Sequence, residues 1–183
     1  MKMKKILLIA IPFLCMLLAS CEKDHWGNGD PALEHVYYVG IQDLIGDNNN
    51  KVTANVKQGD TISVPVQFFS ERVRSYDVVT YYYVGGTLQR GVNYDITDQN
   101  GNILSPDANG AFTLTWPKAV KGVQRVYIKA KNAGKGSFTI LTSNPNAATP
   151  ITSADVSTTV NNKTDQYEVR TFSQNYKATV NVN

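Results

Sequence analysis

Side chains able to perform nucleophilic, acid–base or metal chemistry are scarce in this sequence. Its two histidines are His25 and His35, and neither has a second metal-ligating side chain two or four residues further on. Zinc sites and Ser-His-Asp triads both need histidines placed beside such partners. The sequence also contains no Gly-x-Ser-x-Gly turn that would expose a nucleophilic serine. The histidines therefore predict neither a zinc centre nor a serine hydrolase.

A glycosidase would need two converging carboxyl groups. Glu71, Asp77, Asp95 and Asp98 are candidates by residue type, but solvated surface acids look the same in a sequence. We predict solvated carboxylates, a protein that is not an enzyme, no catalytic residue and no cofactor. A hydrolase with unrecognised acids is the least favoured alternative.

Two polar segments have some features of a calcium loop. Asp98–Asn102 carries oxygen side chains at alternate positions but has no bidentate glutamate downstream. Its Asn100-Gly101 pair is also favoured for a two-residue hairpin turn, in which both central residues take a positive φ. Asp47–Asn50 is followed by Lys51 at the next alternate position. We predict a hairpin turn at residues 100–101 and no metal site.

Aromatic side chains are the remaining chemical signal, with ten tyrosines and two tryptophans in the chain. Adjacent residues of a strand face opposite sides, so the run Tyr81–Tyr83 must place at least one ring outward. An outward tyrosine can stack on a sugar ring or a partner surface; alternatively, the rings cover the sheet faces and pair across strands. The candidate ligand-binding residues are Tyr82, Trp116, Tyr81, Tyr83 and Asn93, with Asn100 and Asn132 as nearby amides.

The elements that must position these side chains are strands. Residues 61–68 alternate between apolar and polar side chains, which is typical of a half-buried strand, and Pro65 favours an edge or a bulge. No window shows a capped helical stripe, and turn pairs such as Gly85-Gly86 and Asn109-Gly110 separate the apolar segments. This pattern predicts an all-β, antiparallel β-sandwich. Further strands are expected at 36–41, 52–56, 76–84, 94–97, 112–116, 124–131, 137–142, 167–172 and 176–182.

The N-terminus has the features of an export signal. Lys2, Lys4 and Lys5 precede an apolar run from Ile6 to Leu18, which is too short to span a bilayer comfortably. The residues Leu18-Ala-Ser-Cys21 end this run and resemble the lipobox of bacterial lipoproteins. The resemblance implies cleavage before Cys21, lipidation of its thiol and a membrane anchor; an ordinary secretory signal is the alternative. Residues 1–20 would then be a lipoprotein signal peptide.

Removal of the signal changes the composition of the chain. The whole sequence has 18 Lys+Arg and 15 Asp+Glu, but three of these lysines and no acid lie in residues 1–20. The basic balance therefore belongs to the export signal, and no nucleic-acid partner is predicted. Cys15 leaves as well, so Cys21 is the one cysteine that remains and a disulfide framework is excluded.

Residues 21–34 are polar and interrupted by glycines and a proline, which predicts a lipidated flexible tether. Its start, Glu22-Lys-Asp24, resembles the short signal of surface-exposed lipoproteins of Bacteroidota. This resemblance implies an outer-membrane protein facing the cell exterior, with the periplasmic side as the alternative. Residues 35–183 are expected to form a single β-sandwich domain.

Three segments together resemble the Calx-beta type of immunoglobulin-like domain. They are Val79–Tyr94, with its Gly91-Val-Asn-Tyr94 element, then Gly110–Pro117 and Val123–Ala130. The resemblance covers about residues 60–140 and implies Val79, Tyr81 and Tyr83 inward, with Thr80 and Tyr82 outward. Asn93 replaces the family's usual acid, and lysines occupy the place of the calcium-binding acidic run, so calcium binding is not implied.

Bacteroidota lipoproteins that combine a lipobox, a short tether and this sandwich often lie beside glycan-uptake machinery, an association that comes from the resemblance alone. We predict a non-catalytic glycan-binding or glycan-uptake accessory lipoprotein. Its expected partners are the membrane, through Cys21, a polysaccharide or oligosaccharide, and an outer-membrane uptake complex. The alternative is a structural or protein-interaction subunit of a cell-surface complex. Aromatic rings clustered at a groove would favour sugar, and a flat apolar patch or long open edge would favour protein.

Overall fold

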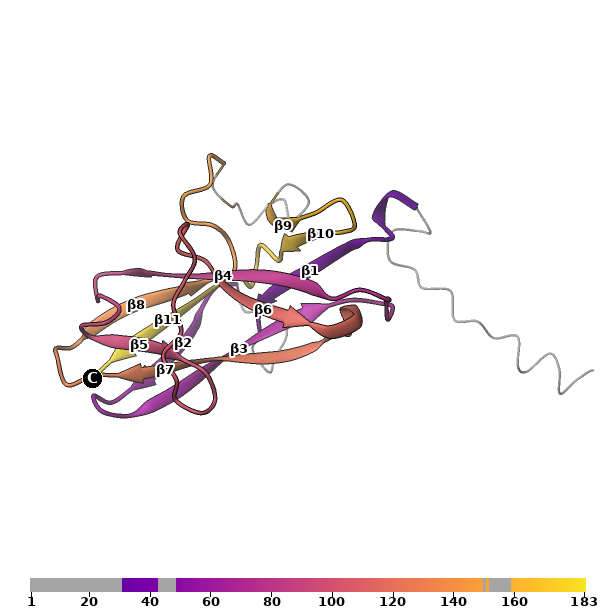
Figure 1. The fold of residues 1–183 in the computed structure, drawn as a ribbon. Coiled ribbons are helices and arrows are strands. Elements are labelled where there is room, and N and C mark those ends of the chain that lie inside the picture. Colours follow the sequence, from indigo (N-terminus) through magenta and orange to yellow (C-terminus); the bar gives the residue numbers. More distant parts are fainter. Residues whose placement is uncertain (1–30, 43–48, 150, 152–158) are drawn as a thin grey trace, which may run out of the picture. The chain divides into compact units, whose positions relative to one another are not determined.

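The computed structural model describes residues 31–42, 49–149, 151 and 159–183 (Figure 1). The expected signal peptide and Cys21 lie outside these residues. The chain divides into two compact units, Met1–Glu34 and His35–Asn183. The described part of the first unit contains the short 3-10 helix η2 (Pro31–Leu33). In the described part of the chain, no helix has the length and apolar content needed to cross a membrane.

The second unit consists of two sheets. The first sheet has the strand order β5-β7-β3-β1-β10-β9, and the second sheet has the order β2-β11-β8-β4-β6. The strands are β1 (Val36–Ile41), β2 (Val52–Val56), β3 (Thr61–Phe69), β4 (Val78–Gly86), β5 (Tyr94–Thr97), β6 (Phe112–Trp116), β7 (Gly122–Ala130), β8 (Gly136–Leu141), β9 (Val160–Lys163), β10 (Glu168–Thr171) and β11 (Lys177–Val182), and the 3-10 helix η3 (Pro117–Ala119) follows β6.

The strand order is immunoglobulin-like. Strands β1, β3, β7 and β5 are neighbours in the order A-B-E-D, and β11, β8 and β4 in the order G-F-C. Most pairs are antiparallel, whereas β1 with β10 and β2 with β11 are parallel. The predicted all-β, immunoglobulin-like sandwich is confirmed.

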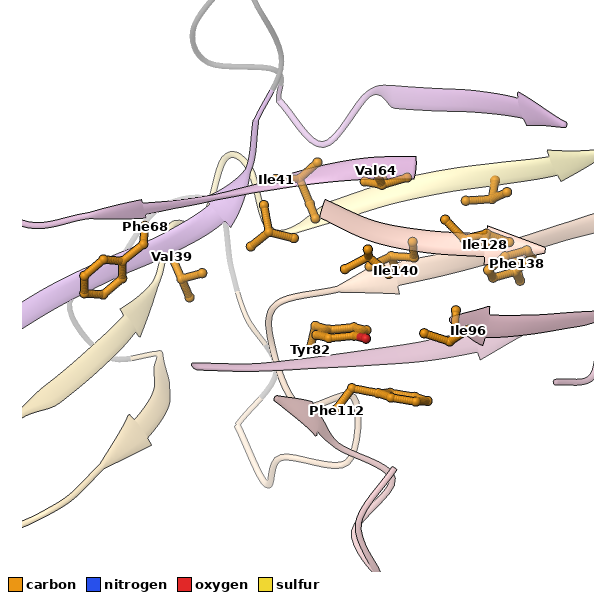
Figure 2. Close-up of a cluster of buried hydrophobic side chains, with 14 of the residues drawn as sticks. Val39, Ile41, Val64, Phe68, Tyr82, Ile96, Phe112, Ile128, Phe138 and Ile140 are labelled. Atoms are coloured by element: carbon orange, nitrogen blue, oxygen red, sulfur yellow. The ribbon is translucent and has the colours of Figure 1, made fainter. Parts of the chain in front are cut away.

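The core lies between the two sheets (Figure 2). Val39 and Phe68 reach it from the first sheet, and Tyr82, Phe138 and Ile140 reach it from the second. Their alternation with less buried neighbours follows the two-residue period of a strand. Each fully buried aliphatic or aromatic side chain contributes roughly 1.5–3 kcal/mol to folding.

Pro65 does not mark an edge, because β3 lies between β7 and β1 in the first sheet. The carbonyl oxygen of Pro65 accepts a hydrogen bond from the Gln42 N–H (3.1 Å), just after β1 ends. In an antiparallel strand, the N–H of a residue points to the same side as its carbonyl group. The N–H that Pro65 lacks would therefore face the end of β1, where the ladder stops, and the prediction of an edge or bulge is wrong.

Candidate functional site

Strand β4 positions the run Tyr81–Tyr83. The residues that point into the core are the opposite of those that the Calx-beta resemblance implied. Val78, Thr80 and Tyr82 are buried on the inner side, so Tyr81 and Tyr83 lie on the outer face of the second sheet. Tyr82 is 2% exposed and lies in the core, as Figure 2 shows. The expectation that Tyr82 faces solvent as a ligand platform is wrong.

Cross-strand pairs explain this phase. The Trp116 indole N–H donates to Thr80 Oγ1 (2.9 Å), and the Trp116 ring stacks on Phe68 with centroids 5.0 Å apart. Tyr82 stacks on Phe112 at the same centroid distance. The inward polar group of Thr80 therefore has a partner, and the large rings fill the core. Trp116 is also 2% exposed, so it is a core residue and not the solvent-facing platform that was expected.

Side-chain amides of β9 hold β4 where β8 has ended. Asn161 Oδ1 accepts from the Tyr81 N–H (2.9 Å), and Asn161 Nδ2 donates to the carbonyl oxygens of Tyr81 (2.8 Å) and Thr142 (2.7 Å). Asn162 Nδ2 donates to the Val79 carbonyl oxygen (2.7 Å). The amides thus replace the missing neighbour strand and satisfy partly buried backbone groups of β4. They fix the backbone that carries Tyr81.

A short loop between β5 and β6, residues 107–111, borders the outer face of β4. We call it the Asp107 loop. Asp107 Oδ1 accepts from the N–H groups of Asn109 (2.8 Å) and Ala111 (2.9 Å), and the Asp107 N–H donates to the Ala111 carbonyl oxygen (2.8 Å). Gly110 has a φ of 81°, in the left-handed region that glycine tolerates without strain. The loop is therefore fixed by its own backbone and one carboxylate oxygen.

The segment after β8 borders the same face. Asn144 Oδ1 accepts from the Asn146 N–H (2.9 Å), and the Ala147 N–H donates to the Asn144 carbonyl oxygen (3.2 Å). This is an Asx-type turn, in which an asparagine side chain replaces a backbone partner. The Asn144 Nδ2 group makes no hydrogen bond to the described residues.

The two loops and β4 enclose a hollow of about 450 Å³, which we call the β4 hollow. This volume is within the range of small-molecule sites. It is open to solvent and lined by Tyr81, Tyr83, Asp107, Ala108, Asn109, Ala111, Asn144 and Asn146. The lining therefore combines two phenol rings with amide groups and one carboxylate.

The pKa of Tyr83 reflects the electrostatics of the β4 hollow. Although it belongs to the outer face of β4, it is only 7% exposed. Burial raises the pKa of Tyr83 above its usual value, and the Asp107 carboxylate raises it further, followed by Tyr81. The phenol is therefore neutral at physiological pH and can both donate and accept a hydrogen bond.

The amides expected from the sequence are not brought to the β4 hollow. Asn93 Oδ1 accepts from the Gln89 N–H (2.9 Å), and its Nδ2 donates to the Ala133 carbonyl oxygen (2.6 Å), so this residue bridges two loops. Asn100 and Asn132 are not among the lining residues. Asn93 is therefore structural in this fold.

The candidate carboxylates also have local structural partners. Asp77 Oδ1 accepts from the Lys118 N–H (2.9 Å), and Asp95 pairs with Lys131 at 2.8 Å. Asp98 closes its own turn through the N–H groups of Asn100 and Asn102. Within the described ranges, no group of three or more histidine, cysteine, aspartate or glutamate side chains is placed to hold a metal ion.

The turn at Asp98–Asn102 is present, but it is not the expected two-residue type. Gly101 has a positive φ (87°), whereas Asn100 does not. The Gly101 N–H donates to the Asp98 carbonyl oxygen (3.1 Å), and the Asp98 N–H donates to that of Asn102 (2.9 Å). This is a longer, three-residue hairpin loop with glycine in the left-handed position. The Asp98 side chain stabilises this loop because its Oδ1 atom accepts the N–H groups of Asn100 and Asn102.

Sequence reasoning identified Tyr81 and Tyr83 but missed the polar residues of the β4 hollow. Asn109-Gly110 and Asn144-Pro145 are turn signals in the sequence, and nothing in them indicates a common location. Their proximity depends on the order β8-β4-β6, which places the segments after β8 and before β6 on either side of β4. Strand order is the information that a local pattern lacks.

Comparison with known proteins does not assign the chain to a family. No family model matches it, and no curated protein matches it. Among solved structures, the chain is similar to CaCohA2 in complex with a CaDoc0917 variant, with 14% identity, 81% of this chain and 99% of that chain covered, and a TM-score of 0.39. The solution structure of CaCohA2 from Clostridium acetobutylicum gives 13% identity, coverage of 81% and 92%, and a TM-score of 0.39. The M1 domain of titin gives 15% identity, coverage of 73% and 90%, and a TM-score of 0.27. These values are too low to support a functional inference, and the Calx-beta resemblance stays a prediction.

Proposed function

We propose that this protein binds a glycan in the β4 hollow without hydrolysing it. The observation that carries the proposal is the pair of tyrosines, Tyr81 and Tyr83, beside four polar side chains in one open depression. Sugar rings present apolar C–H faces and a periphery of hydroxyl groups. Phenol rings match the faces, while amides and a carboxylate match the hydroxyls.

The rigidity of the β4 hollow supports binding. Tyr81 is held through its backbone by Asn161, and the Asp107 loop is closed by its own hydrogen bonds. A site that is already in its bound geometry loses less conformational entropy when a ligand enters. Phenol rings on a fixed strand, with amides on closed turns beside them, together favour a hydroxyl-rich ligand.

The test is a glycan array followed by affinity electrophoresis of the purified protein. Tyr81→Ala should weaken binding about tenfold, since one aromatic contact is worth roughly 0.5–1.5 kcal/mol beyond its area. Tyr127→Ala is the matched control, because Tyr127 is a half-buried tyrosine of β7 in the other sheet. Absence of binding to every glycan would overturn the proposal and favour the protein-interaction alternative, which a pull-down from outer-membrane extract addresses.

We further propose that Cys21 carries the lipid anchor and that the domain faces the cell exterior as an accessory to glycan uptake. The support is the sequence Leu18-Ala-Ser-Cys21 and the acidic-basic start of the tether. Protease treatment of intact cells should digest the domain if it faces outward. Digestion only after outer-membrane permeabilisation would instead indicate the periplasmic side.

A further inference from the structure

Asp107 has a carboxylate oxygen with no side-chain partner among the described residues, whereas both carboxylate oxygens of Asp98, in a related loop, are hydrogen-bonded. In both loops the Oδ1 atom accepts two backbone N–H groups. Asp98 Oδ2 is occupied by the Asn102 side-chain amide (2.7 Å), whereas Ala111 takes the place of Asn102 in the Asp107 loop. No described side chain therefore donates to Asp107 Oδ2, and that oxygen remains open beside the β4 hollow.

The charge of Asp107 is not balanced by the walls of the β4 hollow. Of the described residues that line it, Asp107 is the one charged at neutral pH, and no lysine or arginine is among them. The carboxylate cannot easily rotate away, because its Oδ1 atom is held by the loop backbone. A second negative charge placed in the β4 hollow would meet a fixed like charge.

We infer that the β4 hollow prefers neutral or amino-bearing sugars to anionic ones, such as uronic acid and sulfated glycans. This inference rests on the proposed glycan-binding function and names the class of glycan. Coulomb repulsion between two unit charges about 5 Å apart in water corresponds to a discrimination of about fourfold. It should weaken with added salt, because the site is open to solvent.

The pKa of Tyr83 also shows that the charge of Asp107 acts on other residues of the β4 hollow. The Asp107 carboxylate raises the pKa of the Tyr83 phenol, after burial, which is the larger cause. The field of Asp107 therefore extends to Tyr83, which lines the β4 hollow. A ligand carboxylate in the β4 hollow would experience the same field.

The loop pair provides a matched experiment. Asp107→Asn retains a side-chain oxygen for the two N–H groups of its turn while removing the charge. Asp98→Asn makes the same change in net charge in a loop that does not line the β4 hollow. Thermal unfolding of both variants checks that each has retained its fold.

The probes are linear galactan, linear mannan and curdlan, each tested before and after oxidation of its primary alcohols to carboxylates. Methyl esterification of the oxidised polymers then restores neutrality at nearly unchanged shape. The wild-type protein and Asp98→Asn should bind the neutral and esterified forms about fourfold more tightly than the oxidised form. In Asp107→Asn this preference should fall below about twofold.

Two results separate the inference from the function on which it rests. Equal binding of neutral and oxidised polymers by the wild type, or an equal loss of preference in Asp98→Asn, would overturn the charge selection and leave glycan binding intact. Failure of the wild type to bind these polymers in either form, together with absence of binding to every glycan of the array, would overturn both.

Discussion

At the residue scale, the Asn161 side chain makes the backbone hydrogen bonds that a neighbouring strand would otherwise make. Its amide donates to two carbonyl oxygens and accepts one N–H, which uses most of its hydrogen-bonding capacity. All three partners are backbone groups of the second sheet at places where the ladder is interrupted. Loss of the amide leaves the Tyr81 N–H and carbonyl group without these partners, whereas the Thr142 carbonyl oxygen keeps the hydrogen bond from the Thr171 hydroxyl (2.6 Å).

Asn161→Ala should therefore lower the free energy of unfolding by about 2–4 kcal/mol. Asn181→Ala is the control, because among the described residues the Asn181 amide bonds only to the exposed Asn55 side chain (3.1 Å). The cost of this change should stay at about 0.5 kcal/mol. Urea unfolding of both variants measures the difference. Equal costs would show that the Asn161 bonds are replaced by water.

A second prediction at this scale concerns high pH. Tyr94 stacks on Phe138 in the core, and burial raises its pKa to about 12, with Arg90 opposing. Between pH 10, its ordinary value, and pH 12 the unfolded chain loses this proton while the folded chain keeps it. Stability from this group is thus complete below pH 10 and declines as the pH rises.

Tyr94→Phe keeps the ring and removes the proton, so its stability should fall less steeply than that of the wild type over this range, by about 1–2 kcal/mol. Urea midpoints measured from about pH 9 to about pH 12 give the comparison. Parallel curves for the two proteins would contradict the raised pKa.

At the element scale, β4 and β8 approach closely where Gly86 pairs with Phe138. Gly86 has a φ of 137°, and a Cβ atom there would lie 2.8 Å from the Phe138 Cα atom. Gly85, one residue earlier, has no heavy atom within 4 Å of such a Cβ position. The two neighbours thus provide a matched pair.

Gly86→Ala should destabilise the domain by about 2–4 kcal/mol, because it combines backbone strain with a backbone clash. Gly85→Ala should change the stability by no more than about 0.5 kcal/mol. Thermal unfolding of the two variants checks this contrast, and a tolerated Gly86→Ala would show that β4 can move away from β8.

The expected strand ranges show what a sequence reveals about elements. Alternating segments such as Val36–Ile41 and Phe112–Trp116 have the predicted bounds, since one face is buried and the other is not. Strand β9 was not expected, because Val160–Lys163 has one apolar residue and two asparagines whose side chains do the pairing. The phase of β4 was wrong because both of its faces carry valine and tyrosine, so packing across the core decides.

At the scale of the whole molecule, the candidate site depends on strand order. Tyr81 and Tyr83 were expected from local pattern, whereas Asp107, Asn109 and Asn144 reach them only through the sheet topology. The domain needs no disulfide, since residues 35–183 contain no cysteine. Its position in the cell is predicted to depend on Cys21.

Cys21→Ala should abolish incorporation of labelled palmitate and release the protein from the membrane fraction, because acyl chains contribute about 0.8 kcal/mol per buried methylene. Cys15→Ala is the control, since that cysteine lies in the segment expected to be cleaved. Labelling that persists in Cys21→Ala would rule out the anchor.

The structure of the Asp107 loop also indicates which of its positions can vary. The backbone shape depends on Asp107 and Gly110. The loop at Asp98–Asn102 has the same hydrogen bonds to its aspartate Oδ1 atom but has Gln99 where the Asp107 loop has Ala108. The same shape therefore accepts different side chains at a position that lines the β4 hollow. Substitutions at Ala108 should therefore change the lining of the β4 hollow while the scaffold stays unchanged, and under the proposed function directed libraries should vary this position first.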